Sequence, residues 1–261
     1  MTTLWEGTSL TPLSRKAYSM NLLTSLPNLL IAPGDFFTAF RTEAEDPEQA
    51  GTTRLFGPPL AVLVLLGLVS MFFLQDLVKD VQFEQAVSRI ENNSRLTEEK
   101  KEELMLDMKD RFEHPSTALK VLTWGSSAVS LPIRSAVMAL MALLIGNFIF
   151  GGNVRYGVLF GMTAWAYLIN VIELIVKVPL MLKQWTVEVY TGLGLLGIGE
   201  PGSFLGSFLG QIDLFSLWRI VLISIGMGIL YRQTTTKYLV ALLVLWLLQI
   251  TVTSGLVAAF S

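Results

Sequence analysis

Five segments of this chain are each long and apolar enough to cross a lipid bilayer, and they constrain the fold more than any other feature. A helix needs about 20 apolar residues to cross a hydrocarbon core roughly 30 Å thick. Only 15% of the residues are charged, whereas soluble domains carry about 25%. The sequence therefore predicts an all-α integral membrane protein. The five predicted transmembrane helices are residues 57–74, 132–150, 156–182, 214–231 and 238–260.

A charged insert, residues 75–118, separates the first two predicted spans. It holds seven Lys or Arg against eleven Asp or Glu, a local net charge of −4. Apolar residues recur at helical spacing on each side of "ENNSR", which is typical of a turn. We predict a helical hairpin outside the membrane, whose charges form a solvated face or, alternatively, contact a partner.

The N-terminal region, residues 1–54, contains two short apolar patterns with helical spacing. They are typical of amphipathic helices that lie in the membrane interface on the cytoplasmic side, beside the membrane domain at residues 55–261. A small soluble unit is the alternative. The residues expected to contact the interface are Leu22, Leu26, Leu29, Leu30 and Phe40.

Lys and Arg in short loops indicate the orientation of the chain in the membrane. With the N-terminus in the cytoplasm, the loop 183–212 lies outside and contains only Lys183. This Gly-rich, apolar loop is expected to dip into the interface. We predict an N-in, C-out protein.

Ionisable residues within the predicted spans require an explanation, because each costs about 2.5–3.5 kcal/mol near the bilayer centre. Arg134 is placed in the first turn of the second span, and Arg219 two turns into the fourth. Glu173 and Lys177 lie one turn apart in the third span, with Asn170 just before them. All are expected in the outer half of the membrane, and together they form the candidate polar cluster.

Three interpretations of this cluster stay open. Glu173 and Lys177 can satisfy each other while the arginines extend toward headgroups. Alternatively, Glu173 bridges Lys177 and Arg219 and holds the third and fourth spans together. The third possibility is a proton or ion relay. Asp213 is predicted to cap the fourth span.

Other functional classes find little support in the sequence. The chain has no cysteine, which excludes disulfides and thiolate chemistry, and its only histidine, His114, precedes a proline in the insert. Metal-ligand spacings and nucleotide-binding fingerprints do not occur, so we predict no enzyme, no metal and no cofactor. The net charge of −2 gives no reason to expect nucleic-acid binding.

Three stretches resemble the Yip (Ypt-interacting-protein) family of five-span membrane proteins, in its prokaryotic branch. They are "LLIAPGDFFTAF" (29–40), "IFGGNVRYGVLFGMTAWAYL" (149–168) and "IDLFSLWRIVLISIGMGILYRQTTTKYLVALLVLWLL" (212–248). The aspartate-leucine-tyrosine-glycine-proline motif of eukaryotic members is absent. The motif residues that match are Pro33, Phe36, Phe37, Gly151, Gly152, Asp213, Phe215, Trp218 and Gly226.

The resemblance implies an N-in protein of the bacterial cytoplasmic membrane without enzymatic activity. Eukaryotic members organise membrane trafficking, and some bacterial members act beside ABC exporters or protect against membrane-active peptides. It implies a membrane scaffold or accessory subunit, with an ABC exporter subunit or a second copy of the chain as partner. A small transporter or channel that uses the polar cluster is the alternative.

Overall fold

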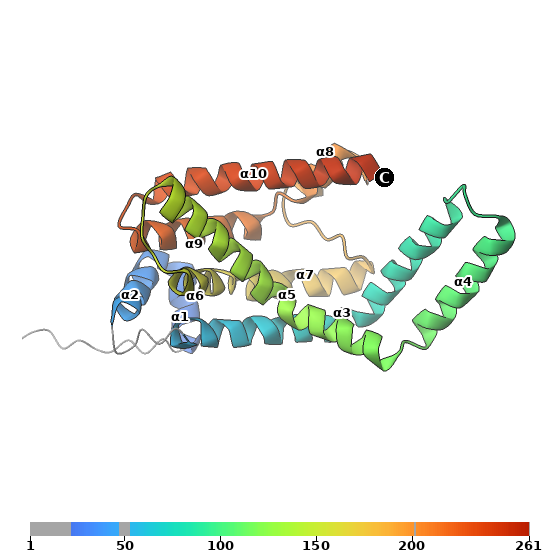
Figure 1. Cartoon of the computed structure of the whole chain (residues 1–261), viewed down its shortest axis with the longest axis horizontal. Helices are drawn as coiled ribbons and strands as arrows, with labels where there is room; N and C mark the ends of the chain where they lie inside the picture. Colours follow the sequence, from blue (N-terminus) through green and yellow to red (C-terminus); the bar gives the residue numbers. More distant parts are fainter. Residues whose placement is uncertain (1–21, 47–52, 201, 261) are drawn as a thin grey trace, which may run out of the picture.

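The computed structural model describes residues 22–46, 53–200 and 202–260, and these residues form a helical bundle (Figure 1). Apart from one isolated bridge between Gly192 and Asp213, the described residues contain no β-structure. The elements are α1 (Leu22–Ile31), α2 (Pro33–Glu45), α3 (Thr53–Glu91), α4 (Glu98–Glu113), α5 (Thr117–Leu143), the π-helical turn η1 (Leu144–Ile149), α6 (Tyr156–Ala166), α7 (Ile169–Gln184), the 3-10 turn η2 (Leu193–Leu196), α8 (Phe204–Gly210), α9 (Leu214–Leu230) and α10 (Thr235–Phe260).

Four helical segments are long and apolar enough to cross a membrane, which confirms an all-helical, multi-span protein. The fifth predicted span corresponds to α9, which has 17 residues and a length of only about 25 Å. A count of five spans therefore stays a prediction. The four long segments are Arg54–Glu91, Thr117–Ile149, Tyr156–Gln184 and Thr235–Ala259.

The second span begins much earlier than the sequence predicts. Its predicted start was Pro132, the first residue of the apolar run, but α5 begins at Thr117 and contains Pro132 in its interior. Ser116 caps this start by accepting a hydrogen bond from the Leu119 amide, at 3.2 Å. An internal proline removes one backbone hydrogen bond. The early turns of α5 are retained because they pack on α3, where Gly67 meets the Ser127 backbone.

The predicted third span is divided into two helices. A turn at residues 167–168 separates α6 from α7. Of the most apolar 18 residues of the segment Tyr156–Gln184, 67% are buried, against 17–22% in the other three long apolar segments. The division lies next to the candidate polar cluster, so it places the first turn of α7 at the centre of the bundle.

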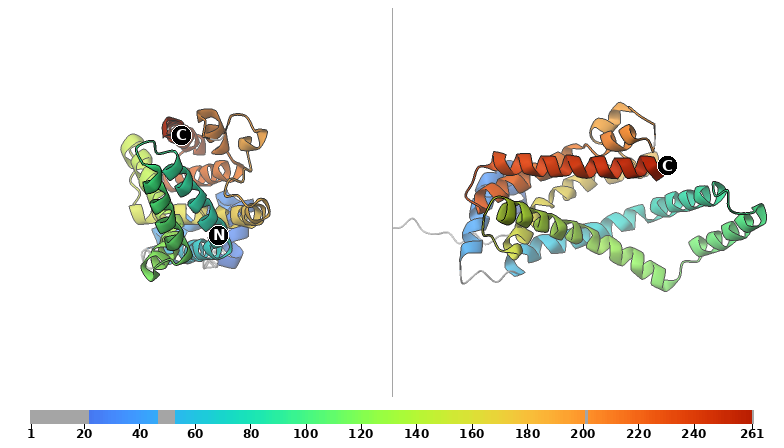
Figure 2. Two further views of the ribbon diagram at one scale, coloured as in Figure 1. Left: turned by 90° about the vertical axis from the view of Figure 1, so that its right-hand side faces the viewer. Right: turned by 45° about the horizontal axis from the view of Figure 1, so that its top comes forward.

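The charged insert forms the predicted helical hairpin (Figure 1). α3 runs without a break for 39 residues, from the apolar segment to Glu91, and α4 returns after a turn capped by Thr97. The rings of Phe83 and Phe112 meet edge to face with centroids 5.4 Å apart. The right-hand view of Figure 2 shows the hairpin extending beyond the other helices.

The N-terminal helices α1 and α2 turn their apolar residues toward protein, a difference from the predicted contact with the membrane interface. Leu29, Phe37 and Phe40 are fully buried. The Phe36 ring lies 5.2 Å from Trp165 of α6, centroid to centroid. Leu22, Leu26 and Leu30 are partly buried against the same core. The aromatic face of α2 thus completes the bundle by packing on α6 and α9.

Candidate functional site

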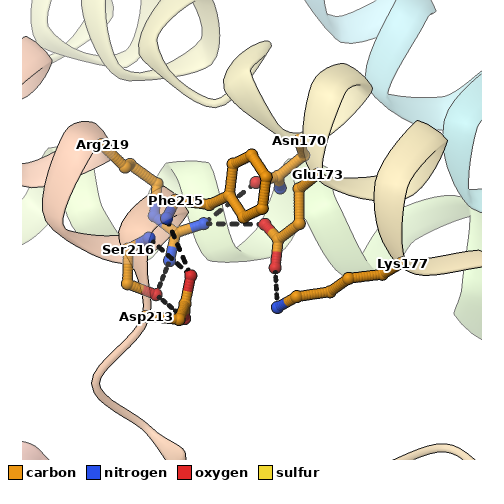
Figure 3. Close-up of polar contacts among 7 residues, drawn as sticks. All are labelled: Asn170, Glu173, Lys177, Asp213, Phe215, Ser216 and Arg219. Carbon is orange, nitrogen blue, oxygen red and sulfur yellow. Dashed lines mark hydrogen bonds and ion pairs between the residues drawn. The ribbon is translucent and has the colours of Figure 1, made fainter. Parts of the chain in front are cut away.

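The polar cluster is assembled by α7 and α9 (Figure 3). Asn170, Glu173 and Lys177 follow one another at helical spacing on one face of α7. Ser216 lies in the first turn of α9, and Arg219 lies one turn further along the same helix. Four of the five predicted cluster residues therefore lie together.

Asp213 is the N-cap of α9, as predicted. One oxygen of its carboxylate accepts hydrogen bonds from the amides of Phe215, at 2.8 Å, and Ser216, at 3.1 Å. The other oxygen accepts the Ser216 hydroxyl at 2.8 Å. Every oxygen of this buried carboxylate is thus occupied within its own helix turn, which is the favoured place for a negative charge.

Glu173 lies between the two cations of the cluster. Its Oε1 accepts a hydrogen bond from Lys177 Nζ at 2.5 Å, and its Oε2 lies 4.0 Å from Arg219 Nη1. Arg219 donates to Asn170 Oδ1 at 3.0 Å and to Ser216 Oγ at 3.1 Å. The same guanidinium lies over the Tyr167 ring, 5.0 Å from the centroid. Glu173 thus bridges the two helices, as the second interpretation of the cluster expects.

The segment that precedes α9 covers the end of the bundle next to the polar cluster. α10 has 26 residues and α9 has 17, so α10 extends about 13 Å further along its axis. α8 occupies this extra length, where Gln211 donates to Ser254 Oγ at 3.0 Å. The segment before α9 therefore packs on the C-terminal part of α10, beyond the polar cluster.

Arg134 occupies a different place from the one predicted. Because α5 begins at Thr117, Arg134 lies about 25 Å along the helix instead of in its first turn. It lines the same cavity as Glu173 and Arg219, but its guanidinium forms no hydrogen bond or ion pair with any described residue. Arg134 as a whole is exposed.

The cavity has a volume of about 1100 Å³ and lies between α3, α5, α7, α9 and α10. Apolar side chains form most of its wall, and the polar cluster forms one side. Within the described residues, no group of three His, Asp or Glu could hold a metal ion. The polar groups that line it are Ser70, Ser127, Ser130, Arg134, Tyr167, Asn170, Glu173, Gln211, Asp213, Ser216, Arg219 and Gln249.

Sequence reasoning missed two contributors to the cluster and one further polar contact. Tyr167 and Ser216 complete the surroundings of Arg219, and the spacing of Ser216 three residues after the capping Asp213 was the available signal. Far from the cluster, Asn147 in η1 accepts the Tyr231 hydroxyl at 2.8 Å and bonds both backbone groups of Val154. No local pattern indicates that contact, because the residues are far apart in the chain.

Several of the motif residues from the three matched stretches lie in the core, away from the polar cluster. A Cβ added to Gly226 of α9 would lie 2.6 Å from Met162 Sδ and 3.2 Å from Phe37. These glycine, phenylalanine and methionine positions thus bring α2, α6 and α9 together. Pro33 begins α2, Gly151 has a φ of 69° in the turn after η1, Gly152 contacts Tyr231, Phe215 is buried and Trp218 is exposed.

The bundle and its buried polar cluster define a multi-span helical membrane protein. A family model described as the Yip1 domain matches residues 28–256, and the chain therefore belongs to the Yip1 domain family. This agrees with the resemblance noted in the sequence. No curated protein and no solved structure matches the chain.

Proposed function

We propose that this protein is a non-enzymatic membrane scaffold or accessory subunit of the bacterial cytoplasmic membrane, N-in and C-out. The observation that carries the proposal is the direct connection of the hairpin to the membrane bundle. α3 is one continuous helix of 39 residues, so a force or contact at the hairpin is transmitted to the bundle without a flexible joint. Membership in a family not known for enzymatic activity supports the non-enzymatic role.

The base of the hairpin is also held from the side. Trp185, at the end of α7, donates its indole N–H to Asp80 Oδ2 at 3.3 Å. Beyond this point the ion pairs of α4 are exposed, such as Arg111 with Asp107 at 3.0 Å. Exposed pairs of this kind contribute little to stability. The excess of acidic side chains is therefore free to face a partner with a basic surface, for which a subunit of an ABC-type exporter is our candidate.

A charge-reversal experiment tests the hairpin as the contact surface. A photo-crosslinking residue at Asp107 is expected to capture an exporter subunit in cells, detected by mass spectrometry. Reversing Glu98, Glu99, Glu102 and Glu103 to lysine is expected to lower that adduct at least about fivefold, because charge complementarity governs encounter. The thermal stability of the purified chain is measured in parallel, because the change also removes the ion pairs Lys100–Glu103 and Lys101–Glu98.

The matched control replaces Lys100 and Lys109 by glutamate, which alters the same helix but keeps its negative charge. Its adduct should remain at the wild-type level. Equal adducts from the control and the reversed variant, or capture of no exporter subunit at all, would contradict the proposal.

A small transporter or channel is the second candidate, favoured by the cavity that the polar cluster lines. A conduit requires water in this cavity. Cysteine introduced at Ser70 or Ser130, which line it without belonging to the cluster, is expected to stay unlabelled by a charged thiol reagent. Exposed Ser88 and fully buried Ser135 serve as the labelled and unlabelled references. Rapid labelling of the cysteines introduced at positions 70 and 130 would support a conduit instead of a scaffold.

A further inference from the structure

The cavity between α3, α5, α7, α9 and α10 combines an apolar wall with two arginines. Its volume of about 1100 Å³ exceeds the roughly 300–1,000 Å³ of sites for drug-sized ligands. Methionines contribute to the wall, and their flexible thioethers adapt to ligands of irregular shape. Its apolar residues include Met71, Leu74, Met138, Met141, Leu242, Leu245 and Trp246.

One side of the cavity is open at the surface of the bundle. Ile133 and Val137 of α5 line it and are 55% and 52% exposed. Gln249 of α10, on the other side, is exposed as well. Both helices belong to segments long and apolar enough to cross the membrane, so this opening faces hydrocarbon. A ligand with long apolar chains can enter there from the bilayer.

The charged side chains in and beside the cavity favour an anionic ligand. The Asp213 carboxylate is occupied by its own helix turn, and Glu173 pairs with Lys177. Arg219 has two neutral hydrogen-bond partners, Asn170 and Ser216, and shares the Glu173 carboxylate, whose Oε2 lies 4.0 Å from it. Arg134 has neither a hydrogen bond nor an ion pair with a described residue. The cavity wall itself carries two arginines and two carboxylates. Lys177, which is not part of the wall but pairs with Glu173, brings the group to three cations and two carboxylates.

Arg134 and Arg219 also belong to the same region of the cavity wall, which includes Tyr167. The Arg219 guanidinium lies over the Tyr167 ring, and Arg134 lines the same cavity wall as Tyr167 and Arg219. An arginine left unpaired inside a membrane is costly and marks a binding site by default. Guanidinium groups bind phosphate oxygens in a bidentate geometry.

We propose that this cavity binds one anionic phospholipid, with the lipid phosphate between Arg134 and Arg219 and the acyl chains along the methionine and leucine wall. The single negative charge of a phosphodiester matches the excess of one cation. Gln249 supplies an additional amide at the open side. A free phosphate ion fits less well, since it would leave the apolar wall without a partner. The proposal does not depend on the hairpin as a contact surface.

Native mass spectrometry of the full chain, purified in detergent and titrated with phosphatidylglycerol, tests this site. The wild type is expected to retain one phosphatidylglycerol per monomer and to retain zwitterionic phosphatidylcholine several-fold less. Arg134→Gln should weaken the binding of phosphatidylglycerol about tenfold, the effect of losing one charge-assisted contact. The fold should tolerate this change, because Arg134 makes no hydrogen bond to the described residues.

Arg95→Gln is the matched control, because Arg95 lies in the exposed turn of the hairpin, away from the cavity. It should bind lipid as the wild type does, and millimolar inorganic phosphate should not displace the lipid. Three results would overturn the proposal: no retained lipid, equal retention by Arg134→Gln, or displacement by phosphate. A dimer mass that Arg134→Gln removes would instead assign the cavity to a second copy of the chain.

Discussion

Replacing Gly67 with valine is expected to prevent stable assembly of α3 on α5. A Cβ at Gly67 would lie 2.1 Å from the Ser127 carbonyl oxygen and 3.2 Å from Ala128 Cα. The obstacle is backbone, which cannot rotate away as a side chain can. Overpacked sites usually cost 1–3 kcal/mol, and we expect a loss of at least about 3 kcal/mol here. Size-exclusion chromatography of a fluorescent fusion after stepwise heating measures the remaining folded fraction.

Gly57→Val provides the control for this prediction. Gly57 lies in the same helix, and a Cβ there would meet no atom within 4 Å. Its folded fraction is expected to stay near the wild-type value, while Gly67→Ala should give an intermediate loss. If Gly67→Val and Gly57→Val lost their folded fraction at the same temperature, the close contact between α3 and α5 would be refuted.

Replacing Glu173 with glutamine is expected to lower the folded yield as severely as Gly67→Val does. The side chains of Glu173 and Lys177 are only 18% and 15% exposed, and the substitution removes the one carboxylate that faces both Lys177 and Arg219. Breaking a buried ion pair from one side costs about 3–5 kcal/mol, because the remaining charge loses its partner. The yield of monodisperse protein and its thermal midpoint in detergent report the effect.

A second substitution separates the role of the charge from the role of shape. The double variant with Glu173→Gln and Lys177→Gln removes both charges, so it should recover a large part of the lost stability. Glu84→Gln in the exposed hairpin is the control and should change neither yield nor midpoint. An unchanged yield for Glu173→Gln alone would exclude a role for the cluster in holding α7 to α9.

Local patterns in the sequence were sufficient for the hairpin and for the cap of α9. The turn around residues 91–95 separates two helical patterns, and the structure ends α3 at Glu91 and begins α4 at Glu98. Asp213 satisfies amides only two and three residues away. Such features depend on neighbours in the chain, so they can be predicted without knowledge of the fold.

The position of Arg134 shows where local rules fail. The apolar run that begins at residue 132 suggested a helix start there, which would have placed Arg134 near the membrane surface. The structure continues α5 through this proline, because residues 117–131 pack on α3 at a site where Gly67 permits close approach. Whether a helix tolerates an internal proline depends on these distant contacts.

The amino-acid sequence by itself determined that the chain is helical, apolar and membrane-embedded, because hydrophobic length and periodicity act along the chain. It also determined which family the chain belongs to, since the motif residues occur in order over residues 28–256. Only the tertiary structure decided that α2 completes the core, that Glu173 meets Arg219, and that Arg134 faces a shared cavity. These outcomes depend on the crossing of helices far apart in sequence, which no local pattern encodes.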